Sequence, residues 1–248
     1  MARWGGLALV GASLALGGCA STRTDATDEF AEDYNDPAEG MNRKIFAFNE
    51  GLDKAVIKPV AKGYGHLPRP ARKSLRNFVR NLSEPVTFAN DVLQGKPKFA
   101  AGTLARFSIN STIGFLGFMD PATDFGIIRH SEDFSQTLAV WGVPEGPYFF
   151  APLLGPMPPR DIVGFVADMA MNPLRWWNDS AARYLRTGKF LIEGVDTRER
   201  ALGTVEDLQK TSLDYYATVR NLYRQNREFQ IRDGKTEFED LPDFEMYE

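Results

Sequence analysis

Apolar residues recur every three or four positions along most of this chain, which is the period of an amphipathic helix. The pattern is clearest in residues 70–82, where Leu75, Phe78, Val79 and Leu82 share one face and arginines line another. It predicts further helices over 45–56, 86–93, 162–171 and 204–222, with breaks at glycine and proline. No stretch shows a convincing strand ladder or the repeated ten-residue strands of a transmembrane barrel, so the predicted fold is mainly helical.

Short polar motifs predict where some of these helices begin or end. Asp36 precedes Pro37, an order typical of an N-cap followed by the first helical turn. Thr204 and Asp207 form a near capping box at the start of the last long helix. The first helix is expected to end before Lys58-Pro59, because the residue before a proline disfavours helical dihedral angles.

The segment from Phe107 to Met119 contains thirteen residues without a charge, bracketed by Arg106 and Asp120. It is too short to cross a bilayer, which takes about 20 residues in a helix. Its polar residues are unfavourable in pure hydrocarbon but suit a wall between lipid tails and water. A buried helix, a re-entrant piece and an interfacial segment all fit this pattern.

Residues 142–159 form an apolar segment with six prolines, three glycines and one charge, Glu145. Proline at this density is expected to exclude regular structure, and the composition is too apolar for a solvated loop. The segment is expected to lodge against lipid or another protein, or to pack on the body's own core. Trp176 and Trp177 present the same alternatives, because tryptophan favours membrane interfaces and also fills cores.

The amino terminus has the pattern of an export signal. Arg3 supplies a positive start, and the fourteen uncharged residues 5–18 match the apolar core of a signal peptide. Leu16 to Cys19 resembles the lipobox of bacterial lipoproteins, a class in which the signal is removed before a cysteine that carries lipid. Residues 1–18 are therefore predicted to be the signal, and Cys19 to be the lipid anchor. Cys19 is the only cysteine, so a disulfide within the chain is not possible.

Charge divides the remaining sequence into three parts. Residues 19–35 are small, polar and acidic and are predicted to be a lipidated, flexible tether, and residues 233–248 an acidic, disordered tail. The body between them, residues 36–232, is basic in spite of an overall net charge of −4. A basic surface attracts anionic partners. An exported lipoprotein meets phospholipid headgroups but not nucleic acid, and a merely solvated basic face is the alternative.

The chain has few residues of the kinds that catalysis requires. Its two histidines, His66 and His130, lack the spacing of metal ligands, and the nucleophile-elbow, phosphate-loop and dinucleotide-binding motifs are missing. His130, Ser131 and Glu132 include the residue types of a hydrolase triad, but neighbours in sequence seldom adopt triad geometry. The sequence therefore predicts no enzymatic activity, no metal site and no cofactor.

Short motifs follow one another in a characteristic order from about residue 36 to residue 227. The first are Asp36-Pro37-Ala38-Glu39, Asn42-Arg43, Glu84-Pro85, Leu93-Gln94-Gly95, Arg106-Phe107, Asn110-Ser111-Thr112 and Asp120-Pro121-Ala122. The densest block is Glu132-Asp133-Phe134, Gln136-Thr137-Leu138, Trp141-Gly142-Val143, Gly146-Pro147-Tyr148, Gly155-Pro156 and Arg160-Asp161. Together these motifs resemble the MlaA (VacJ) family of outer-membrane lipoproteins.

This resemblance implies a single compact, ring-like helical body in the inner leaflet of the outer membrane, with a channel for phospholipid through it. Relatives associate with outer-membrane porin trimers and pass mislocalised outer-leaflet phospholipids to a soluble periplasmic carrier, which preserves lipid asymmetry. The expected function is therefore non-enzymatic phospholipid translocation. The alternatives are a scaffold lipoprotein that binds porins and a membrane phospholipase, which would depend on His130, Ser131 or Ser135.

The resemblance and the sequence patterns together give three groups of candidate residues. The candidates for the lipid channel are Phe48, Asn49, Phe107, Asn110, Ser111 and Thr112. The candidates for a gating loop, hinged at its glycines, are Gly142, Gly146, Pro147, Tyr148 and Gly155. Arg160 and Asp161 are expected to form a structural pair that holds the base of this loop.

Overall fold

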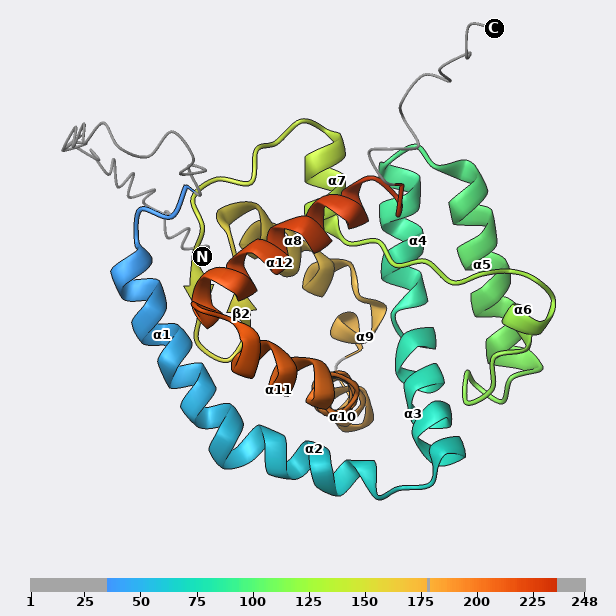
Figure 1. The fold of residues 1–248 in the computed structure, drawn as a ribbon. Helices are drawn as coiled ribbons and strands as arrows, with labels where there is room; N and C mark the ends of the chain where they lie inside the picture. Colours follow the sequence, from blue (N-terminus) through green and yellow to red (C-terminus); the bar gives the residue numbers. More distant parts are fainter. Residues whose placement is uncertain (1–34, 178, 236–248) are drawn as a thin grey trace, which may run out of the picture. The chain divides into compact units, whose positions relative to one another are not determined.

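The computed structural model of the protein describes residues 35–177 and 179–235, which lie in one compact unit (Figure 1). The predicted signal, the anchor Cys19, nearly all of the tether and most of the acidic tail lie outside these residues. The described part is mainly helical, which confirms the predicted fold class. None of the helices in this part is long and apolar enough to span a membrane.

The helices are mostly short, and many begin at a proline. The first elements are α1 (Glu39–Leu52), the π-helix η1 (Asp53–Ile57), α2 (Lys58–Gly65), α3 (Arg69–Asn81), α4 (Glu84–Leu93), α5 (Pro97–Thr112), α6 (Pro121–Asp124) and α7 (Phe134–Val140). The others are β1 (Phe150–Ala151), β2 (Gly155–Pro156), α8 (Pro159–Met171), α9 (Pro173–Trp176), α10 (Ser180–Arg200), α11 (Leu202–Thr211) and α12 (Tyr215–Ile231). A proline occupies one of the first two positions of α3 to α6, α8 and α9, where it costs no helical hydrogen bond.

The first three elements form one continuous, curved rod (Figure 1). The prediction that the first helix ends before Lys58-Pro59 was wrong, because a π-helical turn carries the chain into α2 and Lys58 N donates to Asp53 O across it. Pro59 lacks an N–H, so it leaves one gap in the hydrogen-bond ladder of this rod directly after the π-helical turn. The rod nevertheless continues past the proline along one side of the body.

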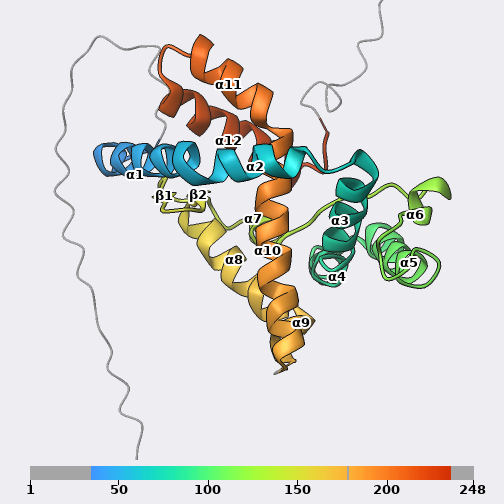
Figure 2. The same ribbon diagram turned by 90° about the horizontal axis from the view of Figure 1, so that it is seen from below.

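The described elements close into a ring. α1 packs against β1, α2 against α10, and α10 against α3. On the other side, α4 packs against α7 and α8, and α7 packs against α8 and α12 (Figure 1). In the view of Figure 2, α8, α9 and the adjoining part of α10 extend to one side of the ring, away from α11 and α12.

The two ends of the body are joined at a buried carboxylate, Asp36. It accepts hydrogen bonds from Asn42 Nδ2 (2.8 Å), Tyr216 Oη (2.5 Å) and Arg220 Nη1 (2.9 Å). The prediction that Asp36 is an N-cap was therefore wrong, and Ala38 is the N-cap residue of α1. The side chain instead links the start of α1 to α12, whose two bonding residues lie 180 and 184 positions later.

The predicted helix over 204–222 was wrong as a single element, because α11 and α12 are separated by residues 212–214. Asp214 caps α12 by accepting a hydrogen bond from Ala217 N (3.1 Å). Thr204 is not a cap, since it lies inside α11. The apolar period continues unchanged across the break, so periodicity alone could not reveal it.

The distribution of polar and apolar side chains differs from that of an ordinary soluble domain. The buried apolar cluster is small and aromatic, formed by Tyr148, Phe150 and Tyr216 with partly buried neighbours. Many buried side chains are instead polar or charged, among them Asn42, Glu84, Asn90, Asp91, Arg106 and Asn110. Many large apolar side chains are exposed, a surface typical of contact with lipid or another protein.

Candidate functional site

The uncharged segment 107–119 is half helix and half turn. Its first residues belong to α5, and residues 113–119 form a turn that leaves Phe115 71% and Leu116 68% exposed. Phe115, Leu116 and Gly117 have φ of 51°, 59° and 94°, a left-handed conformation that residues other than glycine rarely adopt. A Cβ on Gly117 would lie 2.4 Å from the Cβ of Asn81. The turn thus holds its apolar side chains outward, which favours an interfacial segment over a buried helix.

The polar channel candidates at the end of α5 include one buried residue that holds this turn in place. Asn110 Nδ2 donates to Asp120 Oδ1 (2.9 Å), and Asn110 Oδ1 accepts from Ala122 N (3.1 Å). The other candidates on this helix are half-buried or exposed: Phe107, Ser111 and Thr112. In this structure the amide of Asn110 is engaged in joining α5 to α6, and the place of these residues in a channel wall stays a prediction.

Two asparagines on one face of α1, seven positions apart, hold the proline-rich loop, residues 142–159, in place. Asn49 was a candidate from the sequence, whereas Asn42 appeared there only as part of a motif. Each amide donates from Nδ2 to a backbone oxygen of the loop and accepts at Oδ1 from a backbone N–H, at 2.9–3.0 Å. The bonded groups are Tyr148 O and Phe150 N for Asn42, and Ala151 O and Leu153 N for Asn49. Phe48, beside them on α1, is exposed.

The loop contains a short antiparallel hairpin, so the prediction that proline excludes regular structure from residues 142–159 was wrong. β1 and β2 pair with Phe150 opposite Pro156 and with Ala151 opposite Gly155. Each strand has only two residues, and Pro152 falls in the turn between them, where the ladder needs no N–H.

The gating candidates include three glycines at backbone turns and one buried tyrosine. Gly142, Gly146 and Gly155 have φ of 85°, 82° and 85°, a conformation that favours glycine. Tyr148 is fully buried, and its ring contacts two tyrosines of α12 edge-on. Pro147, half-buried, precedes this anchor. The loop is therefore docked on α1 and α12 in this structure, and its opening as a gate stays a prediction.

Arg160 and Asp161 lie at the start of α8, and each connects to a different part of the body. Arg160 Nη1 donates to Val143 O in the loop (3.3 Å). Asp161 accepts hydrogen bonds from Ser135 Oγ of α7 and from Tyr223 Oη of α12. Their own side chains approach to 4.0 Å, measured from Nε to Oδ1. Together they place the base of the loop beside α7 and α12.

A cavity of about 770 Å³ opens between α3, the 113–119 turn and α6. Its basic lining residues are Lys73, Arg76, Arg80 and Arg129, and its large apolar ones are Ile113, Phe118, Met119 and Ile128. Two acidic residues, Asp120 and Asp124, also line it. The arginine face of the helix over 70–82 is visible in the sequence, but the cavity that it borders is not. A basic wall beside an apolar wall suits an anionic amphiphile.

A buried arginine supports this cavity from α5. Arg106 is 2% exposed and donates to Asp120 Oδ1 (2.8 Å) and Thr123 Oγ1 (3.0 Å), and its Nε lies 3.8 Å from Glu84 Oε1. Burial raises the pKa of Glu84, while attraction to Arg129 and Arg106 opposes the rise. The sequence showed Arg106 and Asp120 as brackets of the uncharged segment and as members of short motifs, and the structure shows that they form an ion pair.

The fold also brings together three side chains that could bind a metal ion. Their spacing in the sequence did not suggest such a group. Ligand atoms of Asp91, His130 and Glu132 lie within 4.8 Å of one another. Asp91 is hydrogen-bonded to His130 Nε2 (2.8 Å) and to Thr103 Oγ1 (2.6 Å), and Glu132 accepts from Gln94 Nε2 (2.9 Å). In the part of the chain that the structure describes, no serine hydroxyl is hydrogen-bonded to His130.

Similarity to known sequences shows which protein family this chain belongs to. The sequence profile described as MlaA lipoprotein matches residues 34–230, which is most of the chain. The chain belongs to the MlaA lipoprotein family. It is 35% identical over 238 residues to the intermembrane phospholipid transport system lipoprotein MlaA of Haemophilus influenzae, and 35% identical over 242 residues to that of Escherichia coli K12. Both alignments cover 93% of this chain and 92% of the relative.

Membership of the MlaA family extends to the three-dimensional structure. A solved structure described as the structural basis for maintenance of bacterial outer membrane lipid asymmetry matches this chain with a TM-score of 0.71 and 33% sequence identity. The match covers 79% of this chain and 98% of that chain. The resemblance to the MlaA family that the motifs indicated is therefore confirmed.

Proposed function

We propose that this lipoprotein is a non-enzymatic phospholipid translocator, which removes mislocalised phospholipids from the outer leaflet of the outer membrane and so maintains lipid asymmetry. Its relatives are named as lipoproteins of intermembrane phospholipid transport, and the matching solved structure concerns outer-membrane lipid asymmetry. The structural observation that carries the proposal is a polar interior beside exposed apolar segments. This arrangement suits a body that sits in lipid and shelters polar headgroups.

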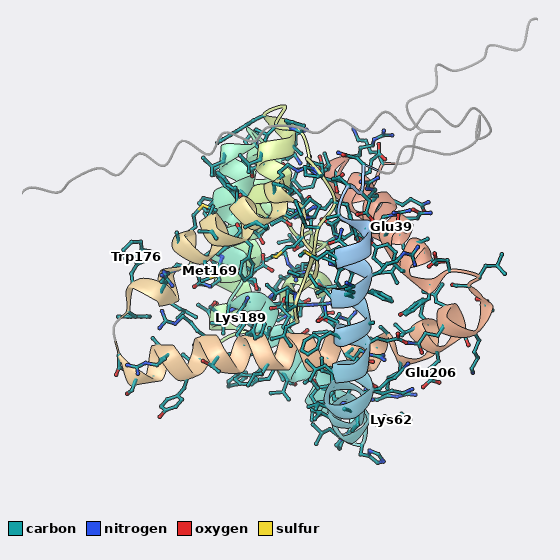
Figure 3. The ribbon with its side chains drawn as sticks, turned by 90° about the vertical axis from the view of Figure 1, so that its left-hand side faces the viewer. Glu39, Lys62, Met169, Trp176, Lys189 and Glu206 are labelled. Atoms are coloured by element: carbon teal, nitrogen blue, oxygen red, sulfur yellow. The ribbon has the colours of Figure 1, made fainter. Side chains whose placement is uncertain are left out.

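The exposed apolar side chains give the body an orientation. On α8 and the segment after α9 they include Ile162, Val163, Val166 and Trp177. Figure 3 shows Met169 and Trp176 on the side opposite Glu39, Lys62 and Glu206. Because a large apolar side chain gains about 1.5–3 kcal/mol when it leaves water, the side with Trp176 is expected to enter lipid. The charged side then faces the periplasm.

The cavity beside α3 would provide a path for the lipid in transit. A charge within hydrocarbon costs roughly 3 kcal/mol or more, and a polar, basic lining lowers that cost for a headgroup. The apolar 113–119 turn would accommodate acyl chains at the same time. No covalent bond changes in this process, so it requires neither a nucleophile nor a cofactor.

The anchor and the partners of the protein belong to the same proposal. Lipid on Cys19 would hold the body at the inner leaflet of the outer membrane, facing the periplasm. Porin trimers would be its neighbours in the membrane, and a soluble periplasmic carrier would receive the phospholipid. The lipobox-like sequence and the family membership support these assignments.

The test compares cells that have the gene with cells that lack it. Outer-leaflet phospholipid is labelled with an amine reagent that does not cross membranes, and it is expected to rise in the deletion strain and return to normal on complementation. Intact phospholipid is expected to co-purify with the full chain in mild detergent, identified by mass spectrometry. Unchanged surface phospholipid in the deletion strain would contradict the proposal.

Two further outcomes of the same experiment would replace the proposal with another function. A lysophospholipid product that disappears in His130→Ala or Ser131→Ala would identify an enzyme. Normal lipid asymmetry together with loss of porin association in the deletion strain would identify a scaffold.

A further inference from the structure

Arg80 of α3 is a half-buried cation without a partner. Among the residues that the structure describes, none forms a hydrogen bond or an ion pair with its guanidinium group. Burial, and then repulsion from Arg129, Arg200 and Arg76, lowers the pKa of Arg80. Cations that leave bulk water are normally paired with an anion. The charges around Arg80 therefore favour the binding of an anion, and no described residue supplies one that pairs with it.

Asp196 of α10, a carboxylate close to Arg80, is already engaged by other arginines. Asp196 of α10 accepts from Arg76 Nε and Nη2, both at 2.7 Å, and from Arg200 Nε at 3.1 Å. Asp196 is 3% exposed, so it has little room for a further partner. The single charge of Asp196 is shared by Arg76 and Arg200, so these two arginines together stay net positive beside Arg80, and Asp196 offsets only part of the repulsion.

The carboxylates on the other side of Arg80 are occupied in a similar way. Asp120 is paired with Arg106 at 2.8 Å. Glu84 is buried and lies 3.5 Å from Arg129 Nε, an ion-pair distance at which Nε still has no hydrogen-bond acceptor. Arg129 thus has unused donor capacity next to Arg80. Asp124 also lines the large cavity, at α6.

Arg80 is shared by three adjoining hollows. It lines the cavity of about 770 Å³ between α3, the 113–119 turn and α6. It also lines a cavity of about 150 Å³ with Arg76, Arg129 and Arg200. A smaller hollow of about 10 Å³ places Asn77 and Asn81 around it. Arg80 therefore borders open space, where its neighbours include these donors and four carboxylates, Glu84, Asp120, Glu193 and Asp196.

The apolar wall of the large cavity indicates which anion belongs there. Ile113, Met119 and Ile128 line it, together with Phe118, whose ring stacks on Phe78 at 4.6 Å between centroids. A free phosphate ion gains nothing from an apolar wall. The acyl chains of a phospholipid do gain from it, because they are removed from water.

We propose that Arg80, together with Arg129, binds the phosphodiester of a phospholipid headgroup in this cavity, while the 113–119 turn receives the acyl chains. The planar guanidinium group can donate two parallel hydrogen bonds to two phosphate oxygens. This site rests on the proposed function, because it names the side chains that hold the lipid in transit. It goes beyond that function in assigning the headgroup to one face of α3.

The test measures binding of dihexanoyl phosphatidylglycerol to the full-length lipoprotein in a nonionic detergent, by titration calorimetry. Arg80→Gln is expected to weaken binding by about tenfold or more, the loss expected for one bidentate, charge-assisted pair. Arg80→Lys keeps the positive charge but cannot donate two parallel hydrogen bonds, so it is expected to bind with intermediate affinity. Arg183→Gln, which removes an exposed arginine of α10, is the matched control and should bind as the wild type does. Wild-type affinity in Arg80→Gln would overturn the proposal.

Two further probes separate a lipid headgroup from free phosphate. Inorganic phosphate is expected to bind the wild type at least about tenfold more weakly than the phospholipid, because it cannot use the apolar wall. Dihexanoylglycerol, which lacks the phosphate, should bind equally to the wild type and to Arg80→Gln. Inorganic phosphate that binds as tightly as the phospholipid would overturn the assignment to a headgroup.

Thermal unfolding distinguishes a binding residue from a structural one. Arg80→Gln removes repulsion among arginines, so the lipid-free variant is expected to melt at the same temperature as the wild type or higher. The wild type should gain thermal stability from the phospholipid, and the variant should lose most of that gain. A variant that melts lower and still binds the phospholipid with wild-type affinity would show a structural arginine and refute the site.

The cell experiment separates this site from the proposed function. Unchanged surface phospholipid in the deletion strain, with lipid binding that still depends on Arg80 in the purified protein, would refute translocation and leave the site standing. Raised surface phospholipid in the deletion strain, with normal lipid binding by Arg80→Gln, would refute the site alone.

Discussion

At the scale of single residues, side-chain amides and carboxylates determine the shape of the irregular segments. Asn42 and Asn49 supply the hydrogen bonds that a neighbouring strand would supply in a larger sheet, and the two-residue strands of the hairpin could not stay in place without them. Asn110 does the same for the connection to α6. Buried backbone groups need partners, and here single side chains provide them.

Asn42→Ala is expected to lower the free energy of unfolding by about 2–4 kcal/mol, because it leaves two buried backbone groups of the loop without partners. Asn49→Ala is the matched control: one of its two backbone partners, Leu153 N, is exposed and can bond to water, so the expected loss is smaller. Chemical denaturation followed by circular dichroism measures both. Equal losses in the two variants would contradict this account of Asn42.

Asp168 makes stability depend on pH. Burial raises its pKa from 3.8 to about 6, although Asn90 Nδ2 (3.0 Å) and Phe134 N (3.1 Å) donate to the carboxylate. Between these pH values the folded state keeps a proton that the unfolded state has released, so stability falls as pH rises from about 4 to 6 and stays lower above that.

Asp168→Asn removes this titration and keeps an acceptor oxygen for both donors. It is expected to raise the free energy of unfolding by about 2 kcal/mol at pH 7.5 and to have little effect at pH 3.5. Denaturant midpoints measured at the two pH values check the prediction. A variant that is less stable than the wild type at pH 7.5 would show that the carboxylate is favourable when charged.

At the scale of secondary-structure elements, the sequence predicted what depends on periodicity and missed what depends on local hydrogen bonds. The helices over 70–82, 86–93 and 162–171 agree with α3, α4 and α8, because each carries apolar side chains at helical spacing. On α4 and α8 the buried residues are mainly polar, and apolar ones such as Ile162 and Val166 are exposed. The π-turn of η1, the break between α11 and α12 and the hairpin leave no trace in the apolar period. Each depends on which donor meets which acceptor. The π-turn and the cap of α12 use residues a few positions apart, whereas the hairpin depends on Asn42 and Asn49, 106 and 102 positions from their carbonyl partners.

The candidate site could also be predicted only in part, because its contacts join residues that are far apart in the sequence. Asn49 could be named from a motif, but its partners in the loop lie 102 and 104 positions away. The cavity beside Arg80 is lined by α3, the 113–119 turn and α6, so it exists only after these elements have packed. An arginine face on an isolated helix looks like a solvated surface, and only its tertiary neighbours reveal that Arg80 lacks an anion.

A substitution at Gly117 tests whether the turn after α5 depends on its left-handed, closely packed backbone. Gly117→Ala is expected to lower the free energy of unfolding by about 2–4 kcal/mol, since φ is 94° and the added Cβ would lie 2.4 Å from the Cβ of Asn81. Gly102→Ala is the control within α5, where the new Cβ would lie 3.9 Å from Ile127, an ordinary contact. That variant should be more stable by up to about 1 kcal/mol. Equal thermal melting of both variants would contradict the role of the turn.

At the scale of the whole molecule, side-chain polarity sets an orientation that no single element shows. α9 lies at the far end of the segment that extends away from α11 and α12 (Figure 2), and Trp176 and Trp177 are 75% and 68% exposed. Tryptophan prefers the boundary between headgroups and acyl chains. The end of the molecule that carries α9 is therefore expected to be the one in contact with lipid.

Fluorescence quenching in vesicles with brominated acyl chains tests this orientation. The full-length lipoprotein is expected to be quenched, and Trp176→Phe with Trp177→Phe to lose most of that quenching. All variants carry Trp141→Phe, which removes the other tryptophan of the body. Adding Leu213→Trp to the double variant then moves the reporter to the connection between α11 and α12, where it should stay bright. Strong quenching of that reporter, or unchanged quenching in the double variant, would show that the other side of the body faces lipid.

The carboxylate of Asp36 has a consequence for the order in which the protein folds. Its partners on α12 are 180 and 184 residues away, so the contact that joins the two ends of the body is among the longest-range between residues that the structure describes. If the proposed export proceeds from the amino terminus onward, this contact would form only after α12 has crossed as well. Closure of the ring is then a late step, and a chain shortened before α12 would keep its early helices without the bonds that unite them.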